Sequence, residues 1–235
     1  MKLFSAVVCA LCLLASGPAA PFASAKEDPS VLERSCAGGA GADCYKLGGI
    51  YGKGKLVPKD QPRANTLYLK ACDAGYAKGC AVAGVVYSRG MGIAQDYARA
   101  AALYERGCAG GDLNACHLGG GAYRKGEGVK KNAVRAIELL EKGCDGGMPA
   151  CCDEAALIYG TGAPGVPKDL ARMSSYLQKS CDGGSAIGCN QLGSNYHFGV
   201  GVPKDEARAV ALLRKACSAG HARSCGNLKS LGASR

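Results

Sequence analysis

Residues 72–80 read CDAGYAKGC, a pair of cysteines eight positions apart with a glycine three residues after the first. The pattern occurs six times in the 235-residue chain, and the first cysteines of successive pairs follow at intervals of 36, 36, 36, 37 and 36 residues. A fixed period of this length is typical of a repeat protein built from stacked supersecondary units. The extra residue of the fourth interval falls in the loop 161–167. The paired cysteines are Cys36 and Cys44, Cys72 and Cys80, Cys108 and Cys116, Cys144 and Cys152, Cys181 and Cys189, and Cys217 and Cys225.

The residues after the second cysteine of a pair predict the first helix of each unit. Small or apolar residues stand three and four positions after this cysteine, and a tyrosine stands seven positions after it. Positions i, i+3, i+4 and i+7 share one face of an α-helix. A glycine on this face, such as Gly84, indicates that another backbone passes close by. The tyrosines are Tyr51, Tyr87, Tyr123, Tyr159 and Tyr196.

A glycine-rich loop ends the first helix, and a capping residue starts the second. Asp or Asn stands twelve residues before the next cysteine, where its side-chain oxygen can accept from the free amides of a first helical turn. The glycine three residues after that cysteine predicts a left-handed C-cap. The N-caps are Asp60, Asp96, Asn132, Asp169 and Asp205, and the glycines are Gly39, Gly75, Gly111, Gly147, Gly184 and Gly220.

These signals predict an all-α fold, an α/α solenoid of helix–turn–helix repeats. Residues 26–235 form one solenoid, with five full helix pairs over about 42–218. A half-repeat from about Pro29 and another after Gly220 cap the two ends, as terminal repeats do in such stacks.

The first 25 residues resemble a secretory leader. Lys2 is followed by an apolar stretch over 3–15 and by small residues ending in Ala25, after which we expect cleavage. A membrane anchor is the alternative, but the run is short and Gly17 and Pro18 interrupt it. No later segment is apolar enough to span a membrane. We therefore expect a secreted or periplasmic protein.

The formal net charge is +10, and removal of the leader takes away one lysine. Lysine and arginine are scattered along the chain and form no single run, which argues against nucleic acid as a partner. Attraction to anionic cell-envelope material stays open.

Each cysteine pair joins the last turn of one helix to the first turn of the next, a geometry that brings two Cα atoms within disulfide range. Zinc is the alternative, but the spacing is unusual for ligands and no paired histidines accompany it. An exported protein favours disulfides. We predict six, one per repeat. Cys151 is left over, as a free thiol, an alternative partner of Cys144 or an intermolecular link.

The assembled pattern resembles the Sel1-like repeats, relatives of the tetratricopeptide repeats. Residues 196–205, YHFGVGVPKD, and 215–217, KAC, show it best. The added cysteine pair resembles the secreted cysteine-rich branch, the Helicobacter cysteine-rich proteins. That resemblance implies α/α repeats with one disulfide per unit, a periplasmic or extracellular address, and for some members penicillin binding or slow β-lactamase activity. The resemblance to other Sel1-like proteins implies a role as an adaptor that assembles complexes.

The sequence shows no catalytic or metal constellation. It has no Ser-x-x-Lys, the acylating motif of serine β-lactamases. Its three histidines, His117, His197 and His221, include no His-x-His pair, and its carboxylates stand mostly at caps and outer helix faces. We predict no catalytic residue, no metal and no cofactor.

The first helices of a solenoid commonly line its concave face, and that face does the binding. We therefore predict a scaffold for protein or peptide partners, with β-lactam or envelope material as alternatives. The expected lining residues, chosen by helical phase, are Lys53, Arg89, His117, Arg124, Lys125, Asn190, Ser194 and His197.

Overall fold

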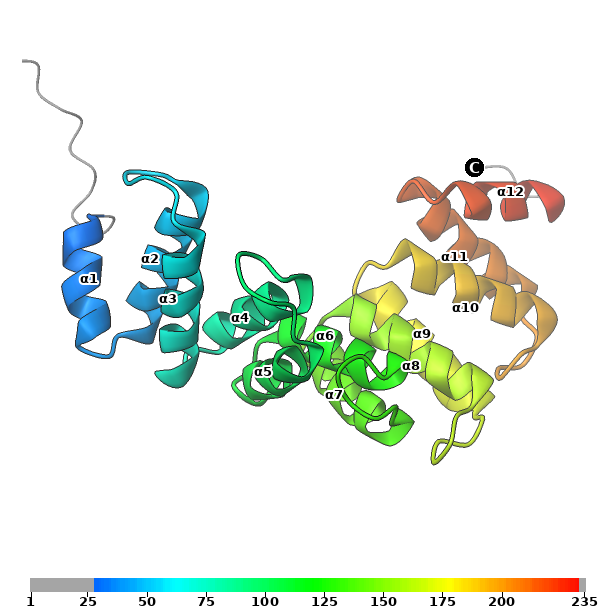
Figure 1. The fold of residues 1–235 in the computed structure, drawn as a ribbon. Coiled ribbons are helices and arrows are strands. Elements are labelled where there is room, and N and C mark those ends of the chain that lie inside the picture. The colour runs from blue at the N-terminus through cyan, green and yellow to red at the C-terminus, as the bar shows by residue number, and fades with distance from the viewer. Residues whose placement is uncertain (1–27, 233–235) are drawn as a thin grey trace, which may run out of the picture.

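The computed structural model describes residues 28–232, which contain twelve α-helices and no strand (Figure 1). The predicted leader, residues 1–25, lies outside the described residues. The predicted all-α solenoid is confirmed. An isolated β-bridge joins Ala163 and Val166, in the loop that holds the extra residue. The helices are α1 Pro29–Ala37, α2 Gly41–Lys53, α3 Gln61–Asp73, α4 Ala77–Arg89, α5 Tyr97–Ala109, α6 Leu113–Lys125, α7 Ala133–Asp145, α8 Pro149–Thr161, α9 Leu170–Asp182, α10 Ala186–Phe198, α11 Glu206–Ser218 and α12 Ala222–Ser230.

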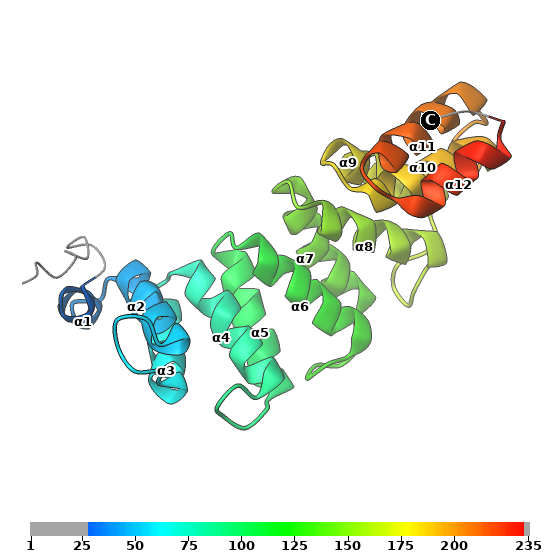
Figure 2. The same cartoon turned by 90° about the horizontal axis from the view of Figure 1, so that it is seen from above.

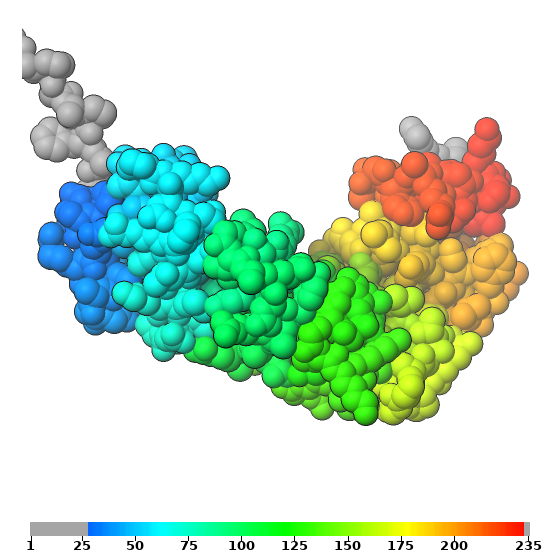
Figure 3. Space-filling model, in the orientation of Figure 1, coloured from blue at the N-terminus to red at the C-terminus, as the bar shows by residue number. Residues whose placement is uncertain are grey.

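Each helix packs against the next one along the chain, so the helices form a curved stack (Figures 1 and 2). In the space-filling view the molecule is hollowed between α2 and α3 at one end and α11 and α12 at the other (Figure 3). Helices α4 and α6 lie on the hollow side of α5 and α7 (Figure 1). Among the first helices of the pairs, α4 also contacts both α2 and α6. The first helices therefore line the inside of the curve.

The predicted caps are confirmed. Asp96 Oδ1 accepts a hydrogen bond from the backbone N–H of Arg99 at 2.9 Å, and the equivalent residues of the other four pairs make the same bond. The six glycines after the helix ends have φ between 80° and 95°. Gly75 is one of them, and the amide of Tyr76 after it donates to Ala71 O at 2.9 Å. Each reversal is therefore fixed by residues within its own repeat.

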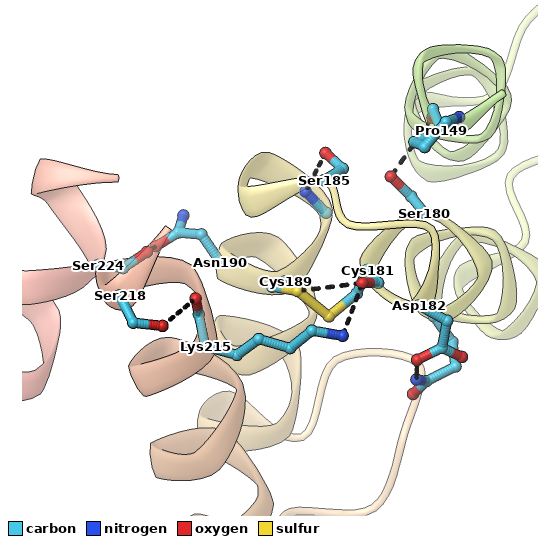
Figure 4. Close-up of a disulfide and its surroundings, with 12 residues drawn as sticks. Pro149, Ser180, Cys181, Asp182, Ser185, Cys189, Asn190, Lys215, Ser218 and Ser224 are labelled. Atoms are coloured by element: carbon cyan, nitrogen blue, oxygen red, sulfur yellow. Dashed lines mark hydrogen bonds between the residues drawn. A yellow bond between two sulfur atoms is a disulfide. The ribbon is translucent and has the colours of Figure 1, made fainter. Parts of the chain in front are cut away.

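Six disulfides tie the repeats together, one at each reversal, as predicted. Their Cα atoms lie 4.5 to 4.8 Å apart. Figure 4 shows one of them, Cys181–Cys189, which joins the end of α9 to the first turn of α10. Each bridge therefore links the second helix of one unit to the first helix of the next.

Basic side chains add a second tie between successive units. Lys215 Nζ donates to the carbonyl oxygen of Cys181 at 2.8 Å (Figure 4), and Lys142 Nζ donates to Ala109 O at 3.1 Å. Both cations lie at the C-terminus of the preceding second helix, where the helix dipole favours positive charge. Arg106 makes the equivalent bond to Cys72 O at 3.2 Å, so three of the second helices carry this tie.

The expectation that another backbone passes close to the glycines of the first helices holds only in part. At Gly84 a Cβ atom would lie 2.5 Å from the ring of Tyr104, and at Gly120 one would lie 2.6 Å from Leu140 Cγ. The nearest atoms therefore belong to a large side chain of the following helix, and at Gly120 a backbone oxygen, that of Ala136, follows at 3.3 Å. Glycine on this face makes room for a tyrosine or leucine of its own helix pair.

Candidate binding surface

The first helices expose one side to the hollow because their other side is buried against the second helices. In α2 the buried residues include Cys44, Leu47 and Tyr51, which share one helical face. Residues two, five and nine positions after the cysteine lie off that face. We call the exposed sides of α2, α4, α6, α8 and α10 the inner surface.

A hollow of about 210 Å³ lies at the middle of the inner surface, over α6. Tyr97 and Tyr104 of α5 contribute one side of it, and Glu154 of α8 contributes another. Tyr97 is 43% exposed, so its ring is open to a partner. We call this the central hollow. Its other lining residues are Ser88, Ala100, His117, Leu118, Gly121, Ala122, Lys125 and Glu127.

A half-buried charge cluster links two repeats beside the central hollow. His117 Nε2 lies 3.1 Å from Glu154 Oε1, and Arg124 Nε donates to Glu154 Oε2 at 3.1 Å. Burial acts to raise the pKa of Glu154, but the hydrogen bond to His117 and the charge of Arg124 outweigh it and lower the pKa. Both carboxylate oxygens are therefore engaged, so the cluster fixes the relative position of α6 and α8.

Three further predicted residues, Lys53, Arg89 and Lys125, are the last residues of α2, α4 and α6. All three are exposed. Lys125 lines the central hollow and lies 3.5 Å from Glu127. The N-terminal part of the inner surface therefore carries a row of cations.

The predicted residues of α10 take different roles. His197 Nδ1 lies 2.9 Å from Glu206, and Ser194 is half-buried. Asn190 is only 8% exposed, and its side-chain oxygen accepts from Ser224 Oγ of α12 at 2.8 Å (Figure 4). Because this oxygen anchors the last helix, Asn190 does not belong to the open surface on which we placed it.

Comparison with known families agrees with this geometry. The Sel1 repeat model matches residues 42–76, 77–112, 115–148, 149–185 and 186–221. The chain belongs to the Sel1 repeat family. A comparison with curated protein sequences gives no match.

Solved structures of Sel1 repeat proteins are similar to this chain. One is c5321, a protective antigen of uropathogenic Escherichia coli, with 27% identity and a TM-score of 0.79 over 86% of this chain and 44% of that one. Another is a Sel1 repeat protein from Oxalobacter formigenes, with 26% identity and a TM-score of 0.71 over 86% and 58%. Helicobacter pylori cysteine rich protein B has 23% identity and a TM-score of 0.45 over 55% and 96%. This chain therefore spans about half the length of the first two.

Sequence reasoning missed three residues that the Sel1 fold brings to the surface. The chosen helical phase comprised the residues one, five, eight and nine positions after the second cysteine of a pair, and two of the three lie outside it. Glu154 stands two positions after its cysteine, and Tyr97 lies on a second helix. Leu157 of α8 is 51% exposed, a large apolar side chain open to solvent. Its position, five after the cysteine, was within the chosen phase, so an unexpectedly apolar residue there was the available signal.

No group of three His, Cys, Asp or Glu side chains in residues 28–232 is arranged to hold a metal ion. In the same range no helix has the length and apolar character to cross a membrane.

Cys151 is a free thiol, and its side chain is fully buried. Its sulfur packs beside Gly143, where an added Cβ would clash with it. Burial, with a smaller contribution from the charge of Glu154, raises the pKa of Cys151 to about 12. The reactive thiolate is therefore scarce at neutral pH in the folded protein.

We expect the native protein to show no rapidly reacting thiol toward an aromatic disulfide reagent at neutral pH. In denaturant the same oxidised chain should expose one thiol after removal of the leader. Rapid reaction in native buffer would contradict the buried position. A Cys151→Ala variant, which should show no thiol in either state, is the control.

Proposed function

We propose that this Sel1 repeat protein is a secreted or periplasmic scaffold that binds protein or peptide segments along its inner surface. The observation that carries the proposal is the central hollow, an open depression with tyrosine, leucine and charged side chains around it. Extended concave faces are the usual binding surfaces of solenoid proteins. Aromatic side chains such as Tyr97 add contact area at little entropic cost.

Two observations support the address outside the cytosol. Six disulfides in so small a protein are typical of oxidising compartments. The first 25 residues also have the charge and apolar pattern of a cleaved leader.

A variant that fills the central hollow tests the binding role. At Gly121 of α6 a Cβ meets no atom within 4 Å, so a Gly121→Gln side chain enters the central hollow without disturbing the helix. Peptides selected from a phage-displayed library on the oxidised protein should bind this variant about tenfold more weakly, a loss of about 1.4 kcal/mol. Fluorescence anisotropy with the selected peptides measures the change.

Gly226 of α12 provides a matched control, because a Cβ there also meets nothing within 4 Å and α12 is the terminal helix. Gly226→Gln should bind the selected peptides as the parent protein does. Failure to enrich any peptide, or equal binding to both variants, would refute the proposal.

Penicillin binding or slow β-lactam hydrolysis, which the family resemblance implies, stays a prediction that a chromogenic β-lactam tests on the same preparation.

A further inference from the structure

A second hollow lies at the N-terminal end of the inner surface. Its volume is about 680 Å³, and residues of α1, α2, α3 and the loop after α2 line it. Within the described part of the chain its lining contains three lysines and no carboxylate. We call it the N-terminal hollow. Its lining residues are Leu32, Tyr45, Lys46, Gly49, Ile50, Lys53, Lys55, Leu56 and Tyr68.

The positive charge of this hollow is only partly balanced. Lys46 is 2.8 Å from Asp43, a carboxylate outside the lining. Lys53 and Lys55 are exposed and form no ion pair within residues 28–232. Two cations separated by one residue therefore face solvent at the edge of a depression that also contains aliphatic and tyrosine side chains.

Leu56, beside these lysines, has an unusual backbone. Its φ is 64°, and it is the one non-glycine residue with positive φ in the described range. The corresponding positions of three later loops are Gly92, Gly128 and Gly201, with φ of 72°, 73° and 68°. A leucine in this conformation is strained by about 1–2 kcal/mol relative to its ordinary region.

In some of the later loops a side chain at this position would clash with backbone. In the third pair a Cβ on Gly128 would lie 2.1 Å from the carbonyl carbon of Tyr97, at the start of the preceding second helix. The side chain of Leu56, in contrast, is 60% exposed. The loop thus presents an apolar side chain toward solvent.

We infer that the N-terminal hollow binds an acidic peptide segment that carries an aliphatic side chain. This inference rests on the proposed binding function and names its partner chemistry. Lys53 and Lys55 attract the carboxylates, since unpaired cations without nearby carboxylates favour negative partners. Leu56, Ile50 and the ring of Tyr45 receive the aliphatic group. Binding by surface lysines weakens as salt screens the charges.

A defined probe tests the inference. The probe is a short fluorescein-labelled peptide of Asp and Glu with a central leucine, and fluorescence anisotropy reports its binding to the oxidised protein. The double variant Lys53→Glu with Lys55→Glu should lower its affinity at least about tenfold. The control, Lys130→Glu with Lys131→Glu, makes the same charge change at two exposed lysines of a later loop. It should change the affinity less than about twofold.

A separate variant tests the apolar part of the N-terminal hollow. Leu56→Gly places the residue of the later loops in the same conformation, so the fold is kept, and the affinity should fall about fivefold. A probe with serine in place of leucine should bind the parent protein with a similar loss. Equal effects of the two lysine pairs, no loss from Leu56→Gly, or no binding of the probe would overturn the inference.

The two proposals fail separately. Gly121→Gln blocks the central hollow and should leave binding of the acidic probe unchanged. If Gly121→Gln weakens binding of the library peptides but the acidic probe does not bind the parent protein, the scaffold function stands and the inference about the N-terminal hollow fails. If no library peptide is enriched and the acidic probe does not bind, both proposals fail.

Discussion

Complete reduction of the six disulfides is expected to unfold the protein at room temperature. Each bridge spans eight positions in the chain, and chain-entropy arithmetic for so short a loop gives roughly 2.5 kcal/mol per bridge. Six bridges therefore contribute on the order of 15 kcal/mol, as much as the whole stability of an ordinary domain. The contacts of a solenoid run mainly between adjacent units, so distant parts of the chain do little to compensate. Far-UV circular dichroism before and after a thiol reductant measures the loss of helix.

A single bridge gives the local version of this test. The double variant Cys108→Ser with Cys116→Ser removes one bridge from the middle of the stack and should lower the free energy of unfolding by about 2–3 kcal/mol in urea. Cys151→Ala leaves all six bridges intact and is the control. Full helicity in the completely reduced chain would contradict the first prediction. An unchanged urea midpoint in the double cysteine variant would contradict the second.

The repeat could be predicted from the sequence because each of its signals is local. An N-cap such as Asp96 bonds an amide three residues away, and a glycine such as Gly75 sets a reversal by its own conformation. A cysteine pair eight residues apart likewise closes within one reversal. These features depend on no distant contact, so spacing alone determines them.

The candidate site could be predicted only in part, because it depends on how successive units are rotated. Glu154 lies 37 residues from His117, and their contact follows from the packing of α8 on α6. Helical phase placed His117 on the inner side of its helix, but it did not include Glu154 and does not give that packing. The same limit misplaced Asn190, whose partner Ser224 lies 34 residues away on the last helix.

The Leu56 backbone was missed for a related reason. Its sequence position shows only that a leucine replaces a loop glycine. Whether a side chain fits there depends on what surrounds the loop: Leu56 is 60% exposed, whereas a Cβ on Gly128 would meet the backbone of Tyr97. The repeat pattern alone does not indicate such differences between units.

Gly128→Ala is expected to destabilise the protein far more than Gly111→Ala. Both glycines have positive φ, 73° and 89°, where alanine is strained by about 1–2 kcal/mol. At Gly128 the added Cβ would also lie within 2.4 Å of three backbone atoms at the start of α5, whereas at Gly111 it meets nothing within 4 Å. Backbone atoms cannot move aside as a side chain does. The loop must therefore separate from the preceding unit, which raises the cost to on the order of 4 kcal/mol.

Urea unfolding of the two alanine variants measures the difference, since the conformational strain is common to both and the crowding is not. The excess loss in Gly128→Ala is then the free energy of the contact between this loop and α5. Equal losses in the two variants would mean that the loop can shift away from α5 at no cost. A large excess would show that the loops, and not only the disulfides, hold the order of the stack, because the loop of one unit then depends on the start of the second helix before it.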